Sequence, residues 1–195
     1  MTILVVVSKG NQACIAADTQ TSFGNITLPG DHHTNSSRSK ISHFRGSYIA
    51  LCGSSAHQRV FNSIIKKYPE HLNFESADNI FETFRNIHTI LKDEYYILST
   101  EGEDEGQPYE SNQMSGVICN QTGIYDFDSY REVAEISQYW AAGSAMQIAL
   151  GALYVGYQLL EDVEQITHMA VNAACKLDSS CGLPLESYVV KLKGY

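Results

Sequence analysis

The stretch that decides the fold opens the chain, where residues 1–22 read MTILVVVSKGNQACIAADTQTS. Two apolar runs, 2–8, which is rich in β-branched residues, and 12–18, flank a Lys-Gly-Asn turn, and this pattern predicts two strands joined as a hairpin. A polar residue lies at each end of this hairpin: Thr2 directly follows the initiator Met, and Asp18 ends the second run. The chain therefore places a hydroxyl at the start of one strand and a lone carboxylate at the end of its partner.

Length and charge bound the class of protein. The chain has 195 residues, 44% of them hydrophobic and 18% charged, so we expect a single domain over residues 1–195. It has no apolar stretch long enough for a membrane span and no secretory signal at its start, so a cytoplasmic protein is expected. A net charge of −9 argues against nucleic acid and anionic membranes as partners, because both bind basic surfaces.

Neither a disulfide framework nor a metal site is expected. Five cysteines are an odd number without a CxxC pair, and most lie in apolar runs, so they are interpreted as small core residues. His32 and His33 lie in a polar loop without a carboxylate cluster, which argues against a metal ion, and no cofactor is implied. The cysteines are Cys14, Cys52, Cys119, Cys175 and Cys181.

Along the rest of the chain, the period of the apolar residues alternates between that of strands and that of helices. Ser54 or Ser55 is expected to cap the first helix and Ser76 the second. Residues 24–39 and the acidic segment 99–113 are interpreted as polar loops. After the hairpin, the expected elements are strands at 40–44 and 47–53, helices at 60–68 and 80–91, strands at 114–120, 123–129 and 138–143, helices at 144–160 and 163–177, and a strand at 186–195.

Two β-layers and two helical pairs predict an α+β fold, a four-layer αββα sandwich, although the periodicity alone also allows an ordinary α+β domain. The helix at 144–160 is apolar nearly all round, so it is expected to be buried. The helix at 163–177 has one apolar stripe, formed by Val163, Ile166, Ala170, Ala173 and Leu177.

Four patches, taken in their order and spacing, carry a resemblance over nearly the whole chain. They are TILVVVSKGNQACIAADTQTSFGN (2–25), YIALCGSSAHQ (48–58), AAGSAMQIALGALY (141–154) and AACKLDSSCGLP (173–184). The chain resembles the proteasome β-subunits among the N-terminal-nucleophile hydrolases, in particular the bacterial peptidase HslV and the bacterial proteasome homologues. This resemblance implies the same αββα sandwich that the period changes predict.

The chemistry of an N-terminal threonine can be argued from the residues themselves. A threonine hydroxyl is a poor nucleophile without an adjacent base. When Thr is the first residue its own α-amine can serve, because the ordinary pKa of that group is about 7.7–8.0. Removal of Met1 would thus make Thr2 both nucleophile and base. A lysine ammonium would favour the alkoxide and lower the pKa of the amine, and a carboxylate would hold that lysine, so Lys40 and Asp18 are the candidates.

Each of these residues also has a plain structural interpretation. Thr2 can be an ordinary strand residue, Asp18 a turn-starting acid and Lys40 a solvated lysine at a strand start. The segment 24–40 is longer than in the family, so Arg38, or a shifted register, is the alternative to Lys40. Lys40 is preferred because Lys-Ile entering a strand matches the family's pattern.

The resemblance extends to four supporting residues. Gly53 matches the glycine whose backbone N–H binds the oxyanion, and its alternative is a tight strand-to-helix turn. Ser144 and Asp178 match polar residues that support the amine, and their alternatives are a helix N-cap and a helix C-terminal turn. Cys181 stands where the family usually has Ser. Because a thiol is a weak hydrogen-bond donor, Cys181 predicts weaker support of the amine and low activity.

The sequence is therefore interpreted as a threonine-type endopeptidase subunit that cleaves unfolded polypeptide through an acyl-enzyme on Thr2. By resemblance, Thr21 and Leu51 line the pocket for the residue before the cut, which predicts an apolar preference. The resemblance also implies self-association into rings or stacked double rings, and by analogy a regulatory ATPase. Two alternatives stay open: an amidase of the same class that acts on a small amide, and a catalytically silent ring subunit.

Overall fold

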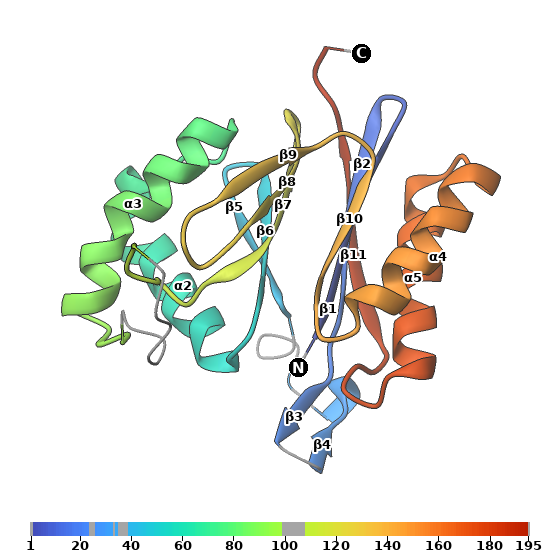
Figure 1. Cartoon of the computed structure of the whole chain (residues 1–195), viewed down its shortest axis with the longest axis horizontal. Coiled ribbons are helices and arrows are strands. Elements are labelled where there is room, and N and C mark those ends of the chain that lie inside the picture. The colour runs from blue at the N-terminus through green and yellow to red at the C-terminus, as the bar shows by residue number, and fades with distance from the viewer. Residues whose placement is uncertain (1, 24–25, 33, 35–38, 99–107, 195) are drawn as a thin grey trace.

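The computed structural model describes residues 2–23, 26–32, 34, 39–98 and 108–194, and it shows two sheets packed face to face with a pair of helices outside each (Figure 1). All pairs of neighbouring strands are antiparallel. The first sheet has the order β10-β1-β2-β11, with β1 Ile3–Lys9, β2 Gln12–Asp18, β10 Tyr139–Gly143 and β11 Leu185–Lys191. The second has the order β5-β6-β7-β8-β9, with β5 Ile41–Phe44, β6 Ser47–Cys52, β7 Ser115–Asn120, β8 Gly123–Phe127 and β9 Val133–Ile136.

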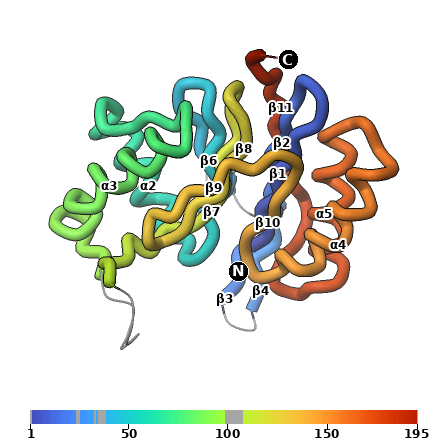
Figure 2. The backbone as a smooth tube through the Cα atoms, turned by 45° about the horizontal axis from the view of Figure 1, so that its top comes forward, coloured from blue at the N-terminus to red at the C-terminus, as the bar shows by residue number. Residues whose placement is uncertain are grey.

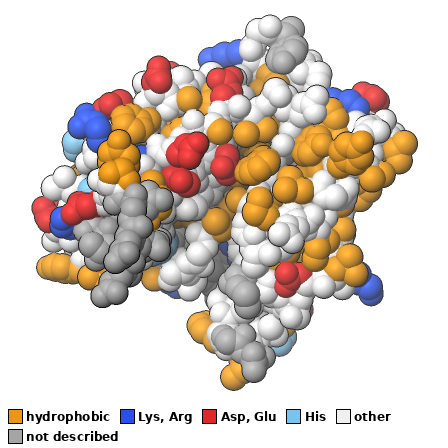
Figure 3. Space-filling view, in the orientation of Figure 1, with side chains coloured by type: hydrophobic (Ala, Val, Ile, Leu, Met, Phe, Trp, Pro, Cys, Tyr) orange, Lys and Arg blue, Asp and Glu red, His pale blue; other side chains and the backbone are white. Residues whose placement is uncertain are grey.

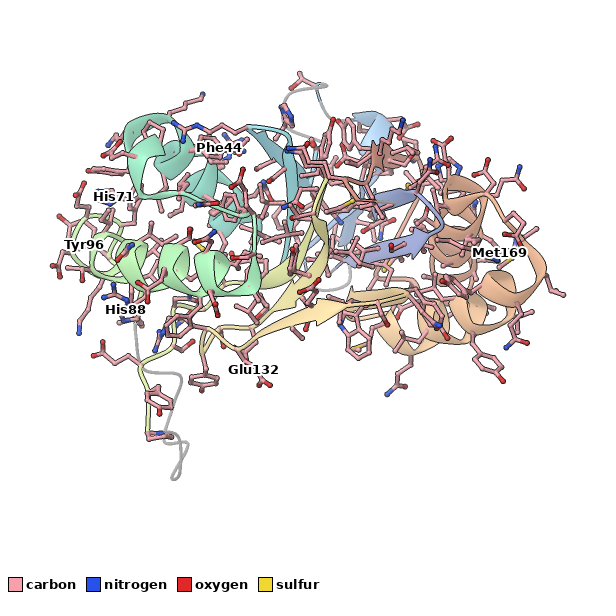
Figure 4. All side chains as sticks on the ribbon, turned by 90° about the horizontal axis from the view of Figure 1, so that it is seen from above. Phe44, His71, His88, Tyr96, Glu132 and Met169 are labelled. Carbon is pink, nitrogen blue, oxygen red and sulfur yellow. The ribbon has the colours of Figure 1, made fainter. Side chains whose placement is uncertain are left out.

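The helices form the two outer layers, so the four-layer αββα sandwich is confirmed. Figure 4 shows this from above, with Met169 in the helical layer at one end of the molecule and His71 and Tyr96 at the other. The helices are α2 Ser55–Lys67, α3 Ala77–Asp93, α4 Met146–Leu159 and α5 Val163–Leu177, and two 3-10 turns are η1 Gly30–His32 and η2 Pro69–His71.

Strand β1 shows how the sandwich is filled, because its two faces belong to two different cores. Ile3, Val5 and Val7 pack toward α4 and α5, whereas Leu4 and Val6 pack toward the second sheet. Successive side chains of a strand point to opposite faces, so a strand that is buried on both must be apolar throughout. This explains the unbroken ILVVV run and why it lacks the alternation of a surface strand.

A third core lies between the second sheet and its helices. It is rich in aromatic rings: Phe84 of α3 stacks on Phe127 of β8 with ring centroids 4.4 Å apart, and Phe61 of α2 lies beside Phe84. The helix caps expected from the sequence are present. The Ser54 hydroxyl accepts from the N–H of Ala56, and the Ser76 hydroxyl begins α3 in the same way.

Three short strands were not expected. β9 lies between the expected strands 123–129 and 138–143, where no element was assigned, and β3 (Thr21–Phe23) with β4 (Ile26–Leu28) forms a small separate sheet. All three are three or four residues long and contain no buried residue, so they lack the alternation of buried and exposed positions that marks longer strands. Figures 1 and 2 place β3 and β4 beside the start of β1, next to the chain's N-terminus.

The expectation that the helix at 144–160 is buried was wrong. Only one side of α4 packs on the sandwich, through Ala149, Leu153 and Gly156, while Tyr154, Val155 and Leu159 are 62%, 51% and 75% exposed. Figure 3 shows the resulting concentration of hydrophobic side chains over this part of the surface. Leu177, at the end of the apolar stripe on α5, is 73% exposed. These apolar side chains are exposed in the single chain.

Candidate active site

A cleft of about 1020 Å³ opens where β1 begins. Thr2 borders it from the first sheet, Leu51 and Gly53 from the end of β6, and one face of α2 forms a long wall. Lys40, which directly precedes β5, and Thr21 of β3 also line it. The cleft therefore gathers five of the residues that the sequence singled out.

Thr2 is held at the mouth of this cleft by the turn that follows β10. Its backbone nitrogen donates to Ser144 Oγ at 3.3 Å, and its carbonyl accepts from the Ser144 backbone N–H at 3.0 Å. Gly143 makes this approach possible. A Cβ at Gly143 would lie 2.2 Å from the Thr2 carbonyl oxygen, and the residue has a φ of +108°. Ser144 is not the helix N-cap that was its alternative, because the cap of α4 is Ala145.

Asp18 is fully buried directly beside Thr2 and binds three groups. Its Oδ1 accepts the backbone N–H of Ile3 at 3.0 Å and the ammonium of Lys40 at 2.7 Å, and its Oδ2 accepts the N–H of Gly182 at 3.1 Å. A buried carboxylate needs such partners, since an unpaired one would be costly to desolvate. Asp18 therefore ties the start of β1 to the lysine and to the loop before β11.

Lys40 reaches Asp18 from a backbone that is itself fixed. Its own N–H donates to Glu186 Oε1 at 2.6 Å, and the next N–H, of Ile41, donates to the same oxygen at 3.3 Å. Only 15% of the Lys40 side chain is exposed. The alternative residue, Arg38, lies outside the described residues. Glu186 was missed, because a glutamate on a strand carries no sequence signal for a contact 146 positions away.

Gly53 lies between the end of β6 and the cap of α2, with a φ of +105°. This left-handed backbone disfavours any residue with a side chain. The ring of His57 lies behind it, since Nδ1 would be 3.8 Å from a Cβ at Gly53. Burial lowers the pKa of His57, which keeps that ring neutral at physiological pH.

The polar group behind Ser144 differs from the expected one. The hydroxyl that contacts Ser144 Oγ, at 2.8 Å, belongs to Ser180, whereas the Cys181 thiol lies in the core between the first sheet and its helices. Asp178 is the C-cap of α5, which agrees with the alternative interpretation of this residue as part of a helix C-terminal turn. Its carboxylate accepts the Ser180 N–H at 2.8 Å. Ser180 was missed because the resemblance pairs position 181, and not 180, with the family's serine.

The cysteines near the site are protonated at neutral pH. Burial, and then the charge of Asp18, raise the pKa of Cys175 to about 12, and the same two causes raise the pKa of Cys181. A protonated thiol is a poor nucleophile, so neither cysteine competes with the Thr2 hydroxyl. No three His, Cys, Asp or Glu side chains gather into a metal-binding group within the described ranges. No helix in those ranges is long and apolar enough to cross a membrane.

The chain is similar to known proteins over its full length. It is 25% identical over 201 residues to a proteasome subunit beta of Nanoarchaeum equitans (strain Kin4-M), covering 100% of this chain and 95% of that protein. Thiobacillus denitrificans BPH in complex with epoxomicin matches at 30% identity with a TM-score of 0.89, covering 98% of this chain and 100% of the other. A second structure of Thiobacillus denitrificans BPH matches at 30% identity with a TM-score of 0.90, covering 99% of this chain and 100% of the other.

A more distant structure shows the fold alone. The eukaryotic HslV from Trypanosoma brucei is 18% identical with a TM-score of 0.64, covering 97% of this chain and 99% of that one. No family model matches the sequence. The full-length identity to BPH, the shared fold and the proteasome relative agree with one another, and the chain belongs to the proteasome β-subunit and HslV-like family of N-terminal-nucleophile hydrolases.

Proposed function

We propose that this proteasome-type subunit is a threonine endopeptidase whose nucleophile is the Thr2 hydroxyl, freed for catalysis by removal of Met1. One observation carries the proposal: Asp18 binds both the Ile3 N–H beside Thr2 and the ammonium of Lys40. A buried carboxylate thereby fixes a cation at the cleft that Thr2 borders. Such an arrangement serves an N-terminal nucleophile and has no evident use for an ordinary strand residue.

The reaction follows from these positions. The Thr2 α-amine takes the hydroxyl proton, Oγ1 bonds to the peptide carbonyl carbon, and the Gly53 N–H donates to the resulting oxyanion. The C–N bond then breaks and the leaving amine takes the proton back, which leaves an ester on Thr2. Water hydrolyses that ester with the same amine as base. Ser144 and Ser180 orient the amine by hydrogen bonding, and Lys40 stabilises the negative charge on Oγ1.

The decisive experiment compares the two N-terminal forms. While Met1 is attached, the Thr2 nitrogen is an amide without a basic lone pair, so that form is expected to be inert. Intact mass after incubation with epoxomicin, the compound bound by the similar BPH, reports Met1 removal and nucleophile reactivity together. We expect an adduct only on chains that begin at Thr2, and none on Thr2→Ala. Equal hydrolysis of a fluorogenic peptide by both forms would overturn the proposal.

One argument for a catalytically silent subunit is weakened. That argument was the cysteine at position 181 in place of the family's serine, but the Ser180 hydroxyl contacts Ser144. Ring assembly is part of the proposal, and it is supported by the exposed apolar side of α4. A ring needs side contacts between unlike surfaces that close on themselves.

A further inference from the structure

The wall of the cleft formed by α2 is polar and has a regular spacing. Ser55, Arg59, Asn62 and Lys66 line the cleft at intervals of three or four residues, so they lie on one face of the helix. At about 1.5 Å per residue, this face runs about 16 Å along the cleft from the end next to Gly53. Phe61 and Ile64 on the opposite side are buried in the core, which fixes the rotation of the helix.

The charges along this wall are all of one sign. Three cations line the cleft, Lys40, Arg59 and Lys66, and no carboxylate is among its described lining residues. Lys40 is neutralised by Asp18, but Arg59 and Lys66 make no ion pair with any described residue. Other cations do pair, for example Arg85 with Glu82 at 2.6 Å. In a chain with a net charge of −9, two cations along one cleft that have no ion-pair partner among the described residues give the cleft a local positive charge.

We propose that Arg59 and Lys66 select peptides that carry a carboxylate side chain close to the cleaved bond. The inference rests on the proposed endopeptidase function, because it assumes that the peptide lies in the cleft bordered by Thr2. Leu51 contacts the residue before the cut, and Arg59, one helical turn from Ser55, meets an acidic side chain a few residues away. The preferred substrate is an apolar residue at the cut with Asp or Glu beside it.

The physical effect is modest and dependent on salt. Arg59 and Lys66 are both exposed, so each pairs with a carboxylate in high dielectric and is screened within about 10 Å at 0.1 M salt. We therefore expect a preference of about threefold to tenfold in kcat/KM for Glu over Gln at the best position. The preference should appear mainly in KM and shrink as the salt concentration rises.

The test uses peptides with leucine before the cut and one varied residue, Glu, Gln or Lys, placed in turn at each neighbouring position. The readout is the ratio of kcat/KM for the Glu and Gln peptides. Arg59→Gln should reduce the best ratio to near one, and Arg59→Glu should invert the preference toward the Lys peptide. Arg85→Gln is the matched control, because it removes the same charge from a helix surface outside the cleft lining and should leave the ratio unchanged.

The same ratio is measured for Lys66→Gln, with Lys67→Gln as its control because Lys67 is not among the residues that line the cleft. Equal ratios for wild type, Arg59→Gln and Arg59→Glu would overturn the inference while leaving the endopeptidase function standing. A loss of ratio in Arg85→Gln as large as in Arg59→Gln would also overturn it, since net charge would then explain the effect. Failure of the endopeptidase function itself appears differently, as no hydrolysis of any peptide and no epoxomicin adduct on Thr2.

Discussion

At the residue scale, the buried Asp18 connects the residue after Thr2 to Lys40 and to the loop before β11. It accepts from Ile3, Lys40 and Gly182, which come from three separate parts of the chain. The sequence could predict Asp18 because a lone acid ends an apolar strand, and it could predict Lys40 because Lys-Ile entering a strand matches the pattern of the family that the chain resembles. It could not predict Glu186 or Ser180, since their roles depend on which backbone groups the fold brings to them.

The first prediction concerns the ion pair. Lys40→Ala should lower kcat/KM for a fluorogenic peptide by about 100-fold or more, because it removes the cation that we propose stabilises the Thr2 alkoxide. The chain should still assemble, since Lys40 lines a cleft and fills no core. Size-exclusion chromatography and the peptide assay measure the two properties. Arg38→Ala is the comparison, and a larger loss there than at Lys40 would reverse the assignment of the cation.

The second prediction separates Ser180 from Cys181. Ser180→Ala removes the hydroxyl that contacts Ser144 and should lower kcat about tenfold, the equivalent of one hydrogen bond, with little change in KM. Cys181→Ala should instead lower the melting temperature while keeping most of kcat, because the thiol fills the core. If Cys181→Ala loses more activity than Ser180→Ala, the thiol and not the hydroxyl supports the amine.

At the element scale, the long elements were predictable and the short ones were not. The caps Ser54 and Ser76 and the apolar helical spacing located α2 and α3, whereas β3, β4 and β9 are too short and too exposed to show a period. The error at α4 has a different cause. A helix that is apolar on all sides is expected to be buried, but the residues that cover it can belong to another chain as well as to the same chain.

The third prediction concerns strand β8. Burial raises the pKa of Asp126 from 3.8 to about 6, with the nearby charges of Asp128 and Glu132 adding to the shift and Trp140 opposing it. A raised folded-state pKa means that the ionised form costs stability. The cost is absent below about pH 4, grows between pH 4 and 6, and is complete above pH 6.

Asp126→Asn should therefore raise the free energy of unfolding at pH 7.5 by about 1 kcal/mol, a value reduced for the partial exposure of the carboxyl. Near pH 4 the gain should vanish. Thermal melts at both pH values measure it, with the exposed Glu75→Gln as a control for the change of net charge. An equal gain at both pH values would show that ionisation of Asp126 is not the cause.

At the scale of the whole molecule, exposed apolar side chains lie at both ends of the sandwich. Tyr154, Val155 and Leu159 form an exposed apolar side of α4, and at the α3 end Tyr96 and Leu98 are exposed near charged pairs such as Lys92 with Glu110. Figures 3 and 4 show the two ends from two directions. An exposed apolar surface of this kind is typical of a contact with another chain, and the proposed ring of copies would supply one.

The last prediction follows from that surface. The protein should elute as a multi-subunit particle, well above its chain mass of 21.6 kDa, in size-exclusion chromatography with light scattering. Tyr154→Glu with Leu159→Glu places two charges on the apolar side of α4 and should shift the particle toward smaller species, because burying them between chains is costly. Both side chains are exposed in the single chain, so its melting temperature should change little. Asn86→Glu, at an exposed polar position of α3, adds a charge away from the α4 surface and should leave the particle intact. Unmodified protein that runs at 21.6 kDa at micromolar concentration would contradict the ring, and with it the enclosed chamber that a ring protease requires.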